Sequence, residues 1–276
     1  MMKQLIAIIL GCILFIACVG KKSEAEQEEG YVQVDSVEKP KDTLQLVEDA
    51  PVPKTADEIF NDFIYTFITD SEFQHERVCF PLRGNNPHAN HINRSEWDKK
   101  SPFNSPEFIS MIYDREKDMN LQKDTTLTHV SVEWIYLNSQ HAVMYNFRKK
   151  HGRWMLTDYE EQNMSQSPLS AFVSFYSKFS SDTLFQKESI DFPLRLVTKS
   201  EGDEEGGEMQ LSPEDWEQFR AEMPLPCGVI TNINYGQPAL SENRKILLVE
   251  GLGNSLYVKY KFDQTDGHWY LYEIEN

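Results

Sequence analysis

A block of sequence near residue 60 recurs 112 positions later, and this internal repeat is the strongest constraint on the fold. Residues 60–83 align on residues 172–195 without a gap, with 11 of 24 positions identical, far more than chance gives. Each block ends in the letters Phe-Pro-Leu-Arg. This part of the shared signature comprises Phe80, Pro81, Leu82 and Arg83 in the first copy and Phe192, Pro193, Leu194 and Arg195 in the second.

A second matching block follows in the same order along the chain. Residues 143–161 align on residues 258–276 with 7 of 19 identities, which include Trp154 and Trp269. Two ordered blocks predict a tandem duplication, with repeats at residues 56–162 and 168–276. Each repeat is long enough for a domain with its own core.

Both repeats open with an amphipathic helical pattern. In the first, Thr55 to Glu58 has capping-box spacing ahead of an aromatic stripe. In the second, Ser167 is the expected N-cap and Pro168 the first helical residue. A short second helix follows Asp70 or Asp182, each of which we expect to be a helix cap or a buried polar contact.

The remainder of each repeat predicts β-strands. Segments rich in Val, Ile, Tyr, Phe and Trp alternate with turn residues, and two hairpin turns end in Gly152 and Gly267 at an expected positive φ. We predict an α+β fold in which N-terminal helices pack on a curved antiparallel sheet in each repeat. The expected strands are 108–113, 130–137, 142–148, 153–160, 229–234, 245–250, 256–262 and 268–275.

The closing hairpin, Tyr-x-Phe followed by Gly-x-Trp-x-Leu, occurs in both repeats. Together with the two opening helices, it resembles the NTF2-like, cystatin-related cone fold. The tandem arrangement is similar to a family of lipoproteins of unknown function from Bacteroides-type gut bacteria. This resemblance implies two cone domains and an envelope location, and it supplies no catalytic residues.

The Phe-Pro-Leu-Arg segments have a structural interpretation. A residue before proline is pushed out of the helical region, so each segment should turn the chain from helix to strand. We expect Phe80 and Phe192 to be buried under the sheet. Arg83 and Arg195 are expected to pair with Glu76 and Glu188.

The N-terminus predicts export. Leu5 to Ala17 is apolar around Gly11 and Cys12, too short to span a bilayer and suited to a signal peptide. Cys18 follows in a sequence that resembles a bacterial lipobox, so residues 1–17 are the predicted signal peptide and Cys18 the predicted lipid attachment site. The expected location is the cell envelope, anchored to the outer membrane and facing either the periplasm or the cell surface.

Residues 18–55 are predicted to be a disordered acidic linker, because they are too polar to form a core. The formal net charge of −17 argues against a nucleic-acid partner. The membrane, reached through the lipid, is the expected partner, together with an unknown small molecule or envelope protein.

Two cysteines remain beyond the predicted anchor. A disulfide between Cys79 and Cys227 is permitted in an export compartment, and two buried free thiols are the alternative.

Residues with potential chemistry are few, and we predict no cofactor, metal or catalytic residue. His88 and His91 could bind zinc, and residues 201–208 could bind calcium, but both segments are more simply variable loops. Asp70, Asp182, Glu76 and Glu188 could act as buried bases in an NTF2-like hydrolase or isomerase. The leading hypothesis is non-enzymatic binding of a ligand or partner through a cone opening or the groove between repeats, and a structural envelope module is a third reading.

Overall fold

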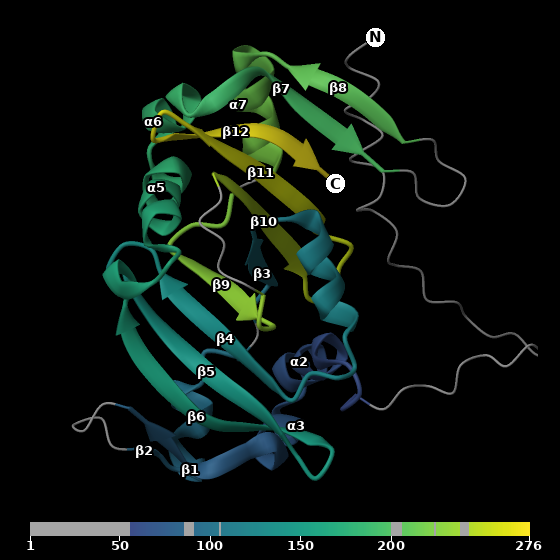
Figure 1. Ribbon diagram of the computed structural model, residues 1–276, viewed down its shortest axis with the longest axis vertical. Helices are drawn as coiled ribbons and strands as arrows, with labels where there is room; N and C mark the ends of the chain where they lie inside the picture. The colour runs from purple at the N-terminus through teal and green to yellow at the C-terminus, as the bar shows by residue number, and fades with distance from the viewer. Residues whose placement is uncertain (1–55, 86–90, 105, 200–205, 224, 238–242) are drawn as a thin grey trace, which may run out of the picture. The chain divides into compact units, whose positions relative to one another are not determined.

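The computed structural model describes residues 56–276 except 86–90, 105, 200–205, 224 and 238–242 (Figure 1). All of these described residues belong to one unit, Pro51–Asn276. We call residues 56–162 the first half and residues 168–276 the second half. Cys18 and the expected signal peptide and linker lie outside the described residues.

Two helices open each half, as the aromatic stripes predict. They are α2 (Phe60–Thr69) and α3 (Ser71–Arg77) in the first half, and α5 (Ser170–Ser181) and α6 (Thr183–Glu188) in the second. Asp70 accepts a hydrogen bond from the Phe73 backbone N–H at 3.0 Å. Asp182 accepts from Leu184 and Phe185 at 3.0 and 3.1 Å. The two aspartates therefore cap α3 and α6, as expected.

The starts of the first helix in each half differ from the prediction. Helix α2 has Ile59 as its N-cap without a side-chain hydrogen bond. Asp57, within the expected capping box, pairs with Arg77 instead, and Thr55 lies outside the described residues. Ser167 accepts from the Leu169 backbone N–H and so closes a turn before α5, which begins at Ser170.

Eight strands fall within a few residues of the predicted segments. The hairpin turns at His151–Gly152 and Asp266–Gly267 have positive φ at both residues, which matches the twist of a two-residue hairpin. The strands are β1 (Val78–Gly84), β2 (His91–Ile92), β3 (Phe108–Tyr113), β4 (His129–Tyr136), β5 (His141–Lys150), β6 (Arg153–Asn163), β7 (Ile190–Thr198), β8 (Gly207–Leu211), β9 (Val229–Asn234), β10 (Arg244–Gly251), β11 (Tyr257–Thr265) and β12 (His268–Glu275). Of these, β1, β2, β7 and β8 were not predicted as strands.

Short helices lie between these elements. They are η2 (Arg94–Glu96), α4 (Trp97–Lys100), η3 (Glu116–Lys123), η4 (Met164–Gln166) and α7 (Pro213–Glu222). No helix in the described part of the chain is long and apolar enough to cross a membrane.

The two sheets exchange one strand each. The first sheet has the order β2-β1-β6-β5-β4-β9, and the second has the order β3-β10-β11-β12-β7-β8. Strand β9 of the second half therefore pairs with β4, and β3 of the first half pairs with β10. Most pairs are antiparallel, but β1–β6 and β7–β12 are parallel. The predicted α+β class with curved sheets is confirmed, whereas the exchange was not predicted.

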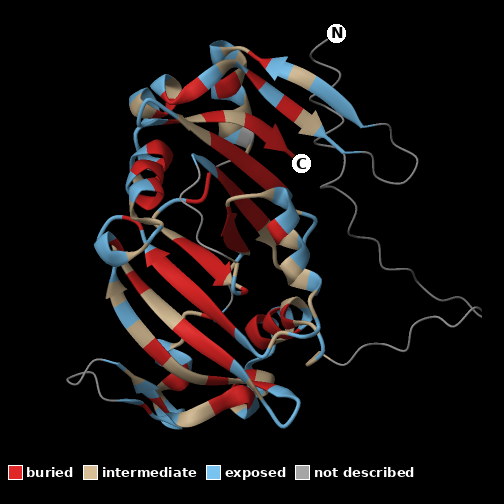
Figure 2. Cartoon of the chain, viewed as in Figure 1, coloured by how far each residue is buried: buried red, intermediate tan, exposed pale blue. Residues whose placement is uncertain are grey.

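Two aromatic cores lie between the helices and the sheets (Figure 2). In the first, Phe60 and Phe63 of α2 lie 4.9 and 6.4 Å from Trp154 between ring centroids. In the second, Phe172 lies 5.4 Å from Trp269. The exchanged strands reach both cores, because side chains alternate between the two faces of a strand. Met111 of β3 belongs to the first core and Ile112 to the second.

The Phe-Pro-Leu-Arg segments lie inside β1 and β7 and are not corners, which corrects the prediction. Both Phe–Pro bonds are cis, and the pairing register shifts across each segment. Phe80 and Phe192 are half-buried.

The expected arginine–glutamate pairs are also wrong. Arg195 pairs with Glu208 and Glu273, because its strand places the side chain beside β8 and β12. Glu76 lies 3.9 Å from Arg153 instead of pairing with Arg83.

Candidate functional site

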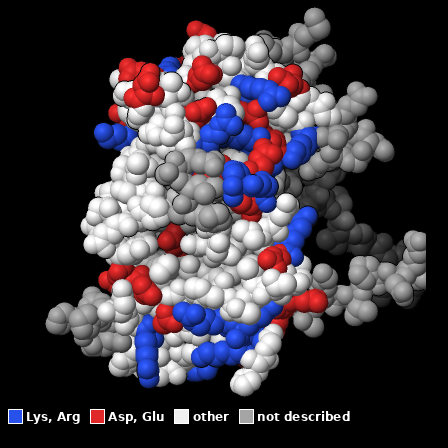
Figure 3. Space-filling view, in the orientation of Figure 1, with Lys and Arg blue, Asp and Glu red and all other residues white. Residues whose placement is uncertain are grey.

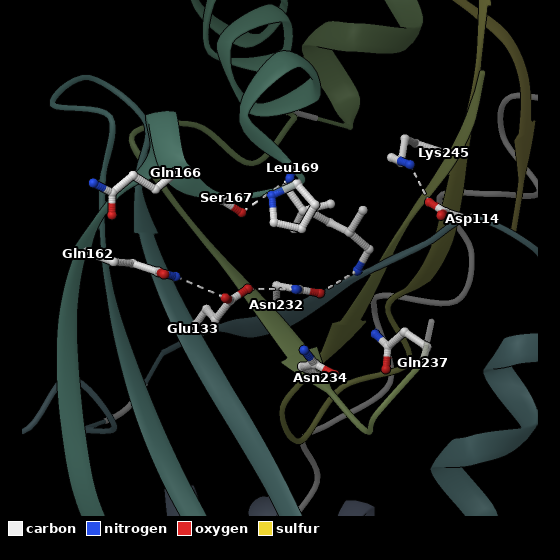
Figure 4. Close-up of a pocket in the computed structure, with 12 residues that line it drawn as sticks. Asp114, Glu133, Gln162, Gln166, Ser167, Leu169, Asn232, Asn234, Gln237 and Lys245 are labelled. Carbon is white, nitrogen blue, oxygen red and sulfur yellow. Dashed lines mark hydrogen bonds and ion pairs between the residues drawn. The ribbon is translucent and has the colours of Figure 1, made fainter. Parts of the chain in front are cut away.

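A polar pocket lies where the exchanged strands meet the first residues of the second half (Figure 4). We call it the inter-half pocket, and its volume is about 160 Å³. Strand β4 contributes Glu133, β9 contributes Asn232 and Asn234, and β10 contributes Lys245. The remaining walls are Ile112, Asp114, Gln162, Gln166, Ser167, Pro168, Leu169 and Gln237.

Glu133 is the central acidic group of the pocket. It is only 7% exposed, and it accepts hydrogen bonds from the amide nitrogens of Asn232 at 2.7 Å and Gln162 at 3.2 Å. Burial raises the pKa of Glu133, and these two hydrogen bonds only partly oppose the shift. Within the described residues, Glu133 forms no ion pair. The pocket therefore holds a buried carboxylate without a neutralising cation.

Both the oxygen and the nitrogen of the Asn232 side-chain amide form hydrogen bonds. Its Oδ1 accepts a hydrogen bond from the backbone N–H of Ile112 at 3.0 Å, which leaves its Nδ2 to donate to Glu133. The strand exchange creates this chain of contacts, because Ile112 lies on β3, Asn232 on β9 and Glu133 on β4. The site would not form if each half kept its own strand.

A buried ion pair forms another wall of the pocket. Lys245 of β10 pairs with Asp114, which directly follows β3, and both side chains are less than a tenth exposed. Each charge neutralises the other, so the pair adds polarity with little net charge. The other polar wall residues are mainly amides and the hydroxyl of Ser167. Such a lining suits a small polar ligand that donates hydrogen bonds to Glu133.

The residues singled out from the sequence lie elsewhere. Asp70 and Asp182 are exposed helix caps, and Glu76 and Glu188 are exposed, so none can be a buried base. Trp154 and Trp269 are core residues. Among the described residues, no group of three or more His, Cys, Asp or Glu side chains could hold a metal.

The segments considered for zinc and calcium binding lie largely outside the described residues. His88 and residues 201–205 lie outside the described part, and His91 is exposed in β2. Glu208 pairs with Arg195.

Cys79 and Cys227 are free thiols, so the expected disulfide is absent. Cys79 lies on β1, and Cys227 lies two residues before β9. These strands are four positions apart in the first sheet, a separation of about 19 Å along the sheet at ~4.8 Å per strand. A disulfide requires Cα atoms within about 7 Å. Neither thiol is buried, which also corrects the alternative.

The signal for the inter-half pocket was present in the sequence but was not recognised. Glu133 lies between the apolar residues Val132 and Trp134, and Asn232 lies between Thr231 and Ile233 in a segment predicted to be a strand. A polar residue in such a position requires a buried partner.

Comparison with protein families identifies the chain. The model of a domain of unknown function, DUF4348, matches residues 40–276, which is most of the sequence. The chain belongs to the DUF4348 family. A search of curated proteins found no match for this DUF4348 chain.

A solved structure supports the same fold. The crystal structure of an NTF2-like protein from Bacteroides fragilis NCTC 9343 is 35% identical in sequence and has a TM-score of 0.70. The match covers 82% of the DUF4348 chain and 98% of the other chain. The predicted NTF2-like fold is therefore confirmed.

Proposed function

We propose that this DUF4348 protein binds a small polar ligand in the inter-half pocket through an ammonium or amide N–H donated to Glu133. The observation that carries the proposal is the burial of Glu133 with amide partners alone. A ligand cation would offset the cost of keeping that carboxylate ionised. A lysine side chain of an envelope protein carries the same ammonium group and would pair with Glu133 in the same way.

The pocket limits the size of the ligand. At about 160 Å³ it is smaller than the ~300–1,000 Å³ of a drug-sized site, so only a few heavy atoms fit. Asn232, Asn234 and Gln237 can orient such a molecule through its other polar groups.

A thermal-shift titration with small amines tests the proposal. We expect methylammonium or ethanolamine to raise the melting temperature saturably, because binding to the folded state stabilises it. Glu133→Gln should abolish the shift, whereas Glu161→Gln, an exposed glutamate on β6, should not. Equal shifts in wild type and Glu133→Gln would contradict the proposal.

The binding should depend on pH in a defined direction. Because the pKa of Glu133 is raised, lowering the pH protonates it earlier than an ordinary glutamate, whose pKa is about 4.3. Amine affinity should therefore fall on acidification before glutamates of ordinary pKa titrate. Calorimetric titration across pH 4–8 measures the effect, and affinity that is constant over that range would contradict an ionised Glu133 as the ligand.

Acid–base catalysis is the second candidate function, favoured by the raised pKa of Glu133. A hydrolase or isomerase activity should rise with pH through that pKa and disappear in Glu133→Gln. If neither binding nor turnover depends on Glu133, the structural-module reading remains.

The location in the cell envelope is also part of the proposal. The lipobox-like sequence before Cys18 supports lipid attachment, and acyl chains provide about 0.8 kcal/mol of membrane affinity per buried methylene. Cys18→Ala should release the protein into the soluble fraction, as measured by membrane fractionation. Cys18→Ala protein that remains in the membrane fraction would refute the lipid anchor, while Cys12→Ala is the matched control.

We further propose that the halves arose by duplication, with domains at 56–162 and 168–276. A shared hydrogen bond supports this origin. Buried Gln74 accepts from the Trp97 indole at 2.9 Å, and Gln186 accepts from the Trp216 indole at 3.2 Å. The same residue types thus make the same contact in both halves.

A further inference from the structure

A groove in the second half is filled in the first. The groove lies between α5, α6 and the β11–β12 hairpin, and its volume is about 540 Å³. Phe175, Phe185 and Trp269 provide its aromatic surface, and Glu188 and Lys178 are among its charged residues. It shares no residue with the inter-half pocket, so it is a separate candidate site.

In the first half, an arginine occupies the corresponding place. Arg77 is 6% exposed, and its guanidinium carbon lies 4.4 Å from the centroid of Phe73. Asp57 accepts hydrogen bonds from both terminal nitrogens of Arg77, at 2.7 and 3.0 Å. Asp57 also accepts from the backbone N–H of Trp154 at 2.9 Å. The first half thus contains an arginine site between Phe73 and β6, the strand of Trp154, and its own Arg77 occupies this site.

The second half keeps the aromatic residues and lacks the arginine. At the 112-residue offset, Phe185 corresponds to Phe73, but Ser189 corresponds to Arg77. Ser189 is too short to reach across the ring. The groove therefore has room for an arginine side chain at the place that Arg77 fills in the first half.

The charged residues beside the groove also differ between the two halves. Glu76 has Arg153 at 3.9 Å. In the second half His268 stands at the position of Arg153, and it lines the groove together with Glu188, the counterpart of Glu76. Glu188 forms no ion pair with any described residue. The second half has thus lost both arginines while keeping a carboxylate and an aromatic ring.

We propose that this groove binds an arginine side chain of a partner protein, with the guanidinium stacked on Phe185 and paired with Glu188. Arginine fits because its planar group combines stacking on a ring with a hydrogen-bonded ion pair. Among the described residues, Lys178 is the only cation near the ring, and its Nζ lies 5.9 Å from the Phe185 centroid, at the limit of such an interaction. An incoming guanidinium would displace it.

A peptide titration on the full-length chain tests the proposal. The probes are blocked Gly-Arg-Gly peptide and its citrulline, lysine and glutamate counterparts, followed by the indole N–H signals of ¹⁵N-labelled tryptophan. We expect saturable shifts of the Trp269 signal with the arginine peptide, and affinity about tenfold lower or worse with citrulline, which has the shape without the charge. Trp269→Phe assigns the signal.

Two variants compare an arginine placed inside the groove with one placed on the exposed surface of α6. Ser189→Arg should fill the groove from within, as Arg77 does, and abolish binding. Leu184→Arg adds the same charge on α6 at a side chain that is 74% exposed, and it should bind like wild type. If Ser189→Arg does not fold, Glu188→Gln serves in its place, with an expected affinity loss of about threefold.

The Lys178→Ala variant tests whether the groove binds a cationic or an anionic side chain. Removing this cation should leave arginine binding unchanged or tighter. The proposal is overturned by weaker arginine binding in Lys178→Ala, by preference for the glutamate peptide, by equal binding to Ser189→Arg and wild type, or by no binding of the arginine peptide.

Discussion

At the scale of single residues, the ion pair of Asp57 and Arg77 joins three parts of the first half. Asp57 precedes α2, Arg77 ends α3, and the backbone N–H of Trp154 on β6 donates to Asp57. Burial alone would raise the pKa of Asp57, but the hydrogen bonds from Arg77 and Trp154 outweigh it, and the pKa is lowered. Folding therefore favours the ionised form of this carboxyl.

Asp57→Asn should destabilise the protein by about 3 kcal/mol at pH 7, because it leaves Arg77 buried without its counter-charge. A lowered pKa stabilises the fold above the unfolded value of about 3.9 and loses that contribution as the pH falls through the folded pKa. The difference between wild type and variant should therefore shrink below pH 4. Urea denaturation at pH 7 and pH 3 measures it, with Asp191→Asn, exposed on β7, as the control.

At the scale of elements, β3 and β9 meet through equivalent residues of the two halves. The backbone N–H of Ser110 donates to the Thr231 hydroxyl at 2.6 Å, and the Thr231 N–H donates to the Ser110 hydroxyl at 2.9 Å. Each hydroxyl also donates to the other residue's carbonyl, at 2.7 and 2.9 Å. This reciprocal contact is fully buried and joins the exchanged strands.

Thr231→Val keeps the shape of the side chain but leaves the buried Ser110 N–H without its acceptor. We expect a loss of about 2 kcal/mol in the free energy of unfolding. Thr265→Val, at an exposed position on β11, should change stability by less than about 0.5 kcal/mol. Urea denaturation measures both.

A double-mutant cycle adds a second check on the contact. The combined loss in Ser110→Ala/Thr231→Val should be smaller than the sum of the single losses, because each single change leaves the other residue unsatisfied. Strict additivity would show that the two residues are not coupled.

At the scale of the whole molecule, each core depends on both halves. Ile246 and Leu248 of β10 belong to the first core, and Ile135 and Leu137 of the β4 region belong to the second. The second sheet also carries interleaved basic and acidic side chains (Figure 3), among them buried Lys259 and Lys261 paired with Glu275. Lys261 reaches Glu116 of the first half as well.

Neither half should therefore fold alone. Residues 51–162 expressed without the rest would lack β9 and the β10 side chains of the first core, and should be unfolded or aggregated. Co-expression with residues 163–276 should recover a one-to-one complex, because the exchanged strands supply the missing partners. Size-exclusion chromatography and circular dichroism provide the measurement. A folded, monomeric single half would contradict the expectation.

The sequence alone determined the kind and position of most elements. Aromatic residues at helical spacing located α2 and α5, and alternating β-branched and aromatic residues located β3 and β9 to the residue. These signals are local, because the periodicity of side chains follows from backbone geometry. The repeat predicted that both halves share this order, and the hairpin motif predicted the NTF2-like fold.

Only the tertiary structure decided which strands pair and which polar residues meet. The pattern of β3 fits the edge of either sheet, because edge strands offer the same backbone hydrogen bonds to any partner. The exchange placed Asn232 beside Glu133, residues 99 positions apart in sequence. The order of strands in the first sheet also keeps Cys79 far from Cys227. The exchange built the inter-half pocket from strands that local sequence patterns assign to different halves.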